Sequence, residues 1–63
     1  MSSSREVIAK LEAAGWRKVR TRGSHVRMTS PDGQRHTTVP HPKKELKRGT
    51  LKAIEKDTGI ALE

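Results

Sequence analysis

Several residue types are scarce or missing in this chain, and each absence excludes a class of protein. The sequence has no Cys, so neither a disulfide framework nor a thiolate metal centre stabilises the fold. It has no Phe or Tyr and a single Trp, so stacking of nucleobases on aromatic rings contributes little to any binding. No apolar run is long enough for a signal peptide or a membrane span, and we expect a cytoplasmic protein without a membrane partner.

The chain is also short, and its length limits where a functional site can lie. We assign all 63 residues, 1–63, to one domain. A domain of this size buries only about 60% of the surface that its unfolded chain exposes. We therefore expect no deep pocket for a large cofactor, assign no cofactor, and place the functional site on the surface.

Positive charge is present in excess. The chain has 14 Lys and Arg against 7 Asp and Glu, a net charge of +7. Residues 17–48 hold 10 basic and 2 acidic residues, a net charge of +8, whereas the remainder holds 4 basic and 5 acidic residues, a net charge of −1. Such a basic segment is typical of a protein that binds a phosphate backbone or an acidic partner. A surface that only confers solubility is the alternative.

The hydrophobic pattern predicts the element order αβββα. The first helix is capped by Ser4 and ends at Gly15, and its apolar face consists of Val7, Ile8, Leu11 and Ala14. Strands follow over residues 16–22, 25–30 and 35–39, with turns at 23–24 and 31–34. The second helix opens at 49–50 and ends at Gly59, with an apolar face of Leu51, Ile54 and, as a further candidate, Ala53. This order predicts an α+β fold, a three-stranded antiparallel sheet with both helices on one face.

The second predicted strand determines which way its histidine faces. Alternation places Val26 and Met28 on one face of the strand and His25 and Arg27 on the other. If the two apolar residues face the core, His25 faces solvent. We expect Trp16 to be a core residue that anchors the first helix to the sheet, rather than a stacking platform.

Segments spread over nearly the whole chain resemble the HicA family of toxins. The segments that carry the resemblance are Gly15-Trp16, Gly23-Ser24-His25, the run from Thr38 through Pro40-His41-Pro42 to Leu46, Gly49-Thr50-Leu51-Lys52-Ala53-Ile54, and Gly59-Ile60. The resemblance implies a ribonuclease with a fold like a double-stranded RNA-binding domain, which cleaves mRNA without a metal and is neutralised by a HicB antitoxin. It also implies that His25 is catalytic. One departure is that residues 26–28 stand where many relatives have aromatic residues.

The chemistry of RNA cleavage is compatible with a histidine at this position. RNA carries its own nucleophile, the 2′-hydroxyl, so a ribonuclease needs one group to remove that proton and another to protonate the leaving 5′-oxygen. Histidine suits either transfer near neutral pH, and Arg22 or Arg27 can stabilise the developing negative charge. The alternative for His25 is a solvated strand histidine that caps a turn.

Further polar residues are predicted to contact the RNA. They are Lys18, Arg20, Arg22, Ser24 and Arg27 around the first two strands, and His41, Lys43, Lys44, Lys47 and Arg48 in the following connector, which we expect to be flexible. Ser24 also suits the turn without any role in binding. His41 is either an exposed loop residue or a phosphate-binding or second proton-transfer group, and His36 is assigned no role.

Two functions remain open at this point. The first is a metal-independent endoribonuclease toxin that works through His25. The second is a non-catalytic module that uses the same basic surface to hold double-stranded RNA. An imidazole held at a glycine turn favours the enzyme, because a module that only binds has no need of it.

Overall fold

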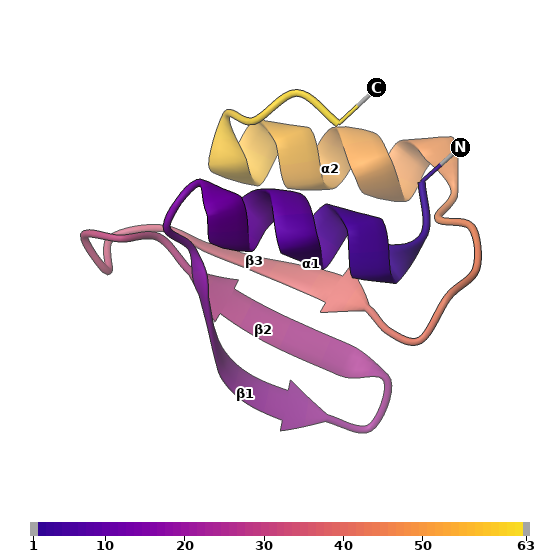
Figure 1. Cartoon of the computed structure of the whole chain (residues 1–63), viewed down its shortest axis with the longest axis horizontal. Helices are drawn as coiled ribbons and strands as arrows, with labels where there is room; N and C mark the ends of the chain where they lie inside the picture. The colour runs from indigo at the N-terminus through magenta and orange to yellow at the C-terminus, as the bar shows by residue number, and fades with distance from the viewer. Residues whose placement is uncertain (1, 63) are drawn as a thin grey trace.

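The computed structural model describes residues 2–62, and its elements follow the predicted order (Figure 1). Helix α1 spans Ser4–Ala13, strands β1, β2 and β3 span Arg17–Arg22, His25–Thr29 and His36–Pro40, and helix α2 spans Arg48–Thr58. The strands form one antiparallel sheet in the order β1-β2-β3. Both helices lie on one side of this sheet, with β1 at the edge farthest from α2 (Figure 1). The predicted α+β architecture is confirmed.

The core lies between the helices and the sheet. Val26 and Met28 of β2 are 2% and 0% exposed, which confirms the predicted orientation of this strand. Trp16 is buried as predicted, directly after α1. The other apolar residues of the core are Val7, Ile8, Leu11, Val39, Leu46, Leu51, Ile54 and Leu62. Removing such residues from water is the main force that holds a domain of this size together.

Two alanines predicted for the helix faces are exposed instead. Ala14 is the C-cap of α1, one position beyond the helix, and its N–H group bonds to carbonyl groups of the last turn. Its side chain therefore does not continue the apolar stripe. Ala53 lies on the side of α2 that borders a surface groove, and so it is exposed as well.

The N-cap of α1 is Ser3, one residue before the predicted Ser4. The Ser3 hydroxyl accepts a hydrogen bond from the Glu6 N–H at 3.1 Å, and the Ser3 N–H donates to the Glu6 carboxylate at 3.0 Å. This reciprocal pair is a capping box. The hydrogen bonds from Ser3 hold the pKa of the Glu6 carboxyl below its usual range. Because three serines are adjacent, only the position of Glu6 distinguishes the cap from its neighbours.

Gly15 permits the sharp turn between α1 and β1. Its φ is +93°, in the left-handed region that residues with a Cβ atom rarely adopt. A Cβ atom at this position would also lie 2.8 Å from Cγ of Pro31, in the β2–β3 turn. The β2–β3 turn therefore packs directly on Gly15, the residue after the C-cap of α1.

The segment between β3 and α2 is fixed to the start of the chain. The Ser4 N–H donates to the Lys43 carbonyl at 2.9 Å, and the Leu46 N–H donates to the Ser2 carbonyl at 2.8 Å. Leu46 is also buried in the core. The prediction of a flexible connector is wrong, because two backbone hydrogen bonds and a buried leucine hold this segment in place.

We predict different stability changes when alanine replaces three of the glycines. Gly23→Ala introduces left-handed strain alone, about 1–2 kcal/mol, because nothing lies within 4 Å of a Cβ atom there. Gly15→Ala adds the overlap with Pro31 and should lower the free energy of unfolding further. Gly49→Ala, in a helix with open space around it, should raise that free energy by about 0.5–1 kcal/mol. Urea denaturation measures all three, and equal losses for Gly15→Ala and Gly23→Ala would contradict the packing of Pro31.

Candidate functional site

His25 is the first residue of β2, and its backbone is held between two neighbouring strands. It pairs with Arg22 of β1 on one side and with Pro40 of β3 on the other. The Ser24 carbonyl, just before it, accepts a hydrogen bond from the His41 N–H at 2.7 Å. The His25 side chain is exposed, as predicted. The imidazole is therefore presented to solvent from a fixed backbone position.

Cationic side chains surround His25 on the face of the sheet that points away from the core. Directly paired residues of antiparallel strands project to the same side, and Arg22 pairs with His25, whereas Arg20 pairs with Arg27. These four residues and Thr38 line one shallow depression of about 360 Å³, which we name the open face. The structure thus brings together four of the predicted site residues.

Lys18 does not join the open face. A β-bulge between Lys18 and Arg20 shifts the register, so Lys18 pairs with the buried Met28 and lies on the side of the core. Arg17 pairs with Thr29 and lies on the same side of the sheet as His25. Strict alternation predicts the opposite arrangement, and no turn residue marks the bulge.

A second depression, of about 330 Å³, lies at the other side of His25. Its basic residues are Lys43 and Lys47, both predicted to contact RNA, and Ser24 and Thr50 also line it. Glu45, which was not among the predicted site residues, contributes a carboxylate. Lys47 is the N-cap of α2 and provides no side-chain cap, so this end of the helix adds positive potential beside His25. Arg48 is the first residue of α2.

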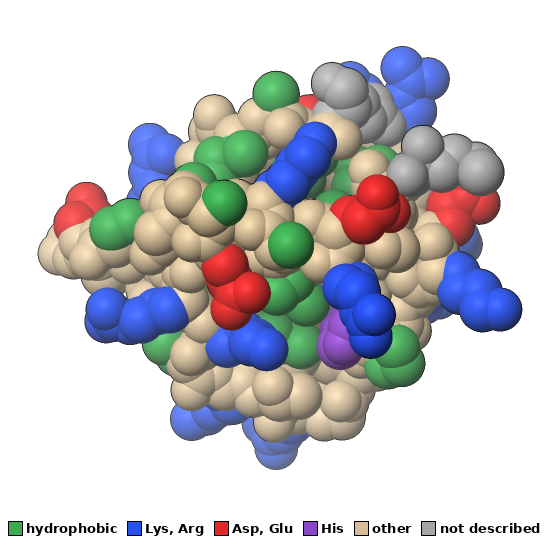
Figure 2. Space-filling view, in the orientation of Figure 1, with side chains coloured by type: hydrophobic (Ala, Val, Ile, Leu, Met, Phe, Trp, Pro, Cys, Tyr) green, Lys and Arg blue, Asp and Glu red, His purple; other side chains and the backbone are tan. Residues whose placement is uncertain are grey.

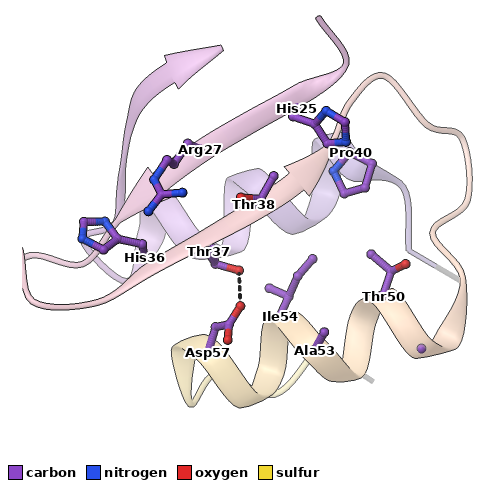
Figure 3. A pocket seen from close by; sticks show the side chains of 11 residues that line it. His25, Arg27, His36, Thr37, Thr38, Pro40, Thr50, Ala53, Ile54 and Asp57 are labelled. Atoms are coloured by element: carbon purple, nitrogen blue, oxygen red, sulfur yellow. Dashed lines mark hydrogen bonds between the residues drawn. The ribbon is translucent and has the colours of Figure 1, made fainter. Parts of the chain in front are cut away.

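A groove between β3 and α2 also reaches His25 (Figure 3). Its volume is about 580 Å³, and we name it the β3–α2 groove. Thr37 on β3 and Asp57 on α2 are joined across it by a hydrogen bond of 3.1 Å from the threonine hydroxyl to Oδ2 of the carboxylate. His25 therefore lies where three surface depressions meet.

His41 lies in a different environment from His25. Its Nδ1 atom is 2.7 Å from the hydroxyl of Ser4, a buried residue that also accepts a hydrogen bond from the Lys43 N–H at 2.9 Å. His41 and Lys44 line a separate depression at the start of α1. The half-buried ring is thus a fixed group rather than an exposed loop residue, and it does not line the depressions that His25 borders.

The face of the molecule in Figure 2 carries charges of both signs. Figure 2 shows Lys and Arg interspersed with Asp and Glu on the side of the molecule that it displays.

Within residues 2–62, no three His, Asp or Glu side chains are arranged to hold a metal ion together. The described helices include none with the length and apolar character needed to cross a bilayer.

The arrangement around His25 combines two chemical abilities. The arginines of the open face can hold a phosphate through charge-assisted hydrogen bonds. The exposed imidazole beside them can act as a general acid or a general base. Both abilities converge at one end of the sheet.

Comparisons with known proteins agree on the family. A family model described as the HicA toxin of bacterial toxin-antitoxin systems matches residues 4–60. One chain of the solved HicA3 and HicB3 toxin-antitoxin complex is similar to this chain, with a TM-score of 0.75 and 35% sequence identity, covering 98% of this chain and 100% of that one. A search of curated proteins finds no match. The fold, the matched residues and the similarity to this solved chain together show that the protein belongs to the HicA family of toxins.

Proposed function

We propose that this toxin is an endoribonuclease that cleaves mRNA through His25, without a metal ion, and that a HicB-type antitoxin neutralises it. The observation that carries the proposal is the exposed imidazole of His25 among Arg20, Arg22 and Arg27 on the open face. Cleavage of mRNA would take place in the cytoplasm.

The proposed reaction is an internal transesterification. The 2′-oxygen attacks the adjacent phosphorus, the bond from phosphorus to the 5′-oxygen breaks, and the products end in a 2′,3′-cyclic phosphate and a 5′-hydroxyl. His25 removes the proton of the 2′-hydroxyl or protonates the leaving 5′-oxygen, and solvent water makes the other proton transfer. Arg22 and Arg27 stabilise the charge that develops on the phosphate oxygens. The nucleophile belongs to the RNA, so the protein needs no metal to generate one.

The RNA backbone would follow the cations around His25. Arg20 and Arg27 extend the open face along the sheet, and Lys43 and Lys47 extend the positive surface toward α2. Phosphate contacts of this kind position the substrate and do not select its sequence. With Trp16 buried in the core, stacking on an aromatic ring is not part of the proposed interface.

A non-catalytic module that binds double-stranded RNA is the second candidate function. The fold and the positive surface suit it equally well. Membership of a toxin family favours the enzyme. The imidazole on the open face favours it as well, because a module that only holds RNA needs cations there and no imidazole.

The variant His25→Ala separates the two functions. We expect the parent protein to cleave RNA in EDTA and the variant to lose at least about 100-fold in rate, since general acid–base catalysis contributes about 10²–10⁴-fold. RNA binding should change little, because the cations remain. Gel analysis of cleavage and a filter-binding assay measure the two properties.

His36→Ala is the control, because it removes another exposed imidazole of the sheet, one that borders the β3–α2 groove but not the open face. It should lower the cleavage rate far less than His25→Ala does. Cleavage by His25→Ala at the parent rate would exclude His25 as the catalytic group. RNA binding without cleavage by the parent protein would favour the non-catalytic module.

The proposed antitoxin would cover the open face. A HicB-type protein with an acidic surface matches the charge of Arg20, Arg22 and Arg27, and opposite charges accelerate association at low ionic strength. The solved relative is a toxin-antitoxin complex of HicA3 and HicB3, which supports a partner of this class.

We therefore expect an equimolar HicB-type protein, encoded beside this chain, to suppress RNA cleavage. The association rate constant should fall steeply with added salt, because the interface pairs opposite charges. Stopped-flow binding at several salt concentrations and the cleavage assay test this prediction. Tight binding that leaves cleavage unchanged would contradict coverage of the open face.

A further inference from the structure

The β3–α2 groove continues from the proposed catalytic histidine to a carboxylate. At one end it is bordered by His25, Pro40 and Thr50, and at the other by Thr37 and Asp57 (Figure 3). Its two walls are strand β3 and helix α2, both of which pack against the core. A ligand that reaches His25 can therefore extend into a groove with rigid walls.

The lining of the groove suits a flat ring with a polar edge. Pro40 and Ala53 supply apolar surface, Thr38 and Thr50 supply hydroxyl groups, and His36 adds an imidazole. Small-molecule sites commonly combine such an apolar lining with a few polar groups, within volumes of about 300–1,000 Å³. The groove, at about 580 Å³, lies within this range. A nucleobase has the required shape, because its faces are apolar and its edge carries hydrogen-bonding groups.

Asp57 has a position that helix stability does not explain. It lies in the last turn of α2, where the helix dipole disfavours a negative charge. Its Oδ2 atom accepts the hydrogen bond of the buried Thr37 hydroxyl, which fixes the carboxylate at the border of the groove. A carboxylate retains further acceptor sites after one such bond.

A carboxylate at this end of the groove discriminates between the parts of an RNA chain. It repels a phosphate group, whereas it accepts hydrogen bonds from the N–H groups of a base. Arg27 and His36 line the groove on the same side as Asp57, whereas His25 lies at the opposite end (Figure 3). Asp57 thus supplies the groove with a carboxylate acceptor for base donors, away from a phosphate that lies near His25.

We propose that the β3–α2 groove binds the nucleobase next to the cleaved phosphate and that Asp57 selects a base with an exocyclic amino group over uracil. The proposal rests on the proposed ribonuclease function and adds base selection to it. Adenine, cytosine and guanine each carry an amino group that can donate to the carboxylate. Uracil carries a carbonyl oxygen where cytosine carries its amino group, and its one N–H donor on that edge lies between two carbonyl oxygens, which the carboxylate repels.

The variant Asp57→Asn tests base selection without removing the hydrogen bond to Thr37. The amide oxygen can still accept from the threonine hydroxyl, and the amide N–H₂ group then replaces an acceptor with a donor. Glu12→Gln is the matched control, because it removes the same charge from an exposed position on α1, outside the groove. Thermal melting of both variants reports whether they remain folded.

The experiment is cleavage of an RNA pool with a randomised segment, followed by sequencing of the product ends. For the parent protein and Glu12→Gln, uracil should be depleted at one position next to the cleavage site by about tenfold, as expected from one base-specific contact. For Asp57→Asn, this depletion should disappear or turn into a preference for uracil. The ratio of bases within one sample does not depend on the fraction of folded protein.

Each other outcome overturns the proposal in a distinguishable way. Absence of cleavage by the parent protein would overturn both the ribonuclease function and the base subsite. Cleavage that depends on His25 but uses all four bases equally would overturn the subsite alone. An equal loss of cleavage at every sequence in Asp57→Asn would show that Asp57 has only a structural role. If Asp57→Asn kept the base ratio of the parent protein but bound the HicB-type protein more weakly, the groove would be assigned to the antitoxin instead.

Discussion

Strand β2 lies between β1 and β3, and the burial of alternate side chains along it determines the rest of the site. Val26 and Met28 are almost completely removed from water, so neither can move to the other face without a large loss of hydrophobic stabilisation. A shift in register by one residue would bring His25 and Arg27 into the core. The apolar core thus keeps the imidazole and its neighbouring guanidinium in solvent.

The neighbouring elements complete the site from both sides of β2. Strand β1 places Arg20 and Arg22 beside Arg27 and His25, so the cations of the open face are set by strand pairing rather than by flexible loops. On the other side of β2, strand β3 and helix α2 form the β3–α2 groove, and α2 carries the carboxylate of Asp57. The surface proposed to bind phosphate and the groove proposed to bind a base therefore meet at His25.

The pattern of apolar residues was sufficient to predict the element order, the antiparallel sheet and the exposure of His25. Local geometry was not predictable in the same way. The bulge that separates Lys18 from Arg20 has no glycine or proline to mark it, and the contact between Ser4 and His41 joins residues that are distant in the sequence. The groove was missed because it depends on how α2 packs against β3, and periodicity within either element does not specify that packing.

An NMR titration of the histidine ring signals with an RNA that cannot be cleaved tests the role of His25 at its centre. Replacing the 2′-hydroxyl at the cleavage site with hydrogen removes the nucleophile and leaves the phosphate in place. We predict that the ring signals of His25 shift strongly on binding, because the phosphate lies beside that imidazole, and that those of His41 shift less. RNA binding that leaves the His25 signals unchanged would contradict the central role assigned to this residue.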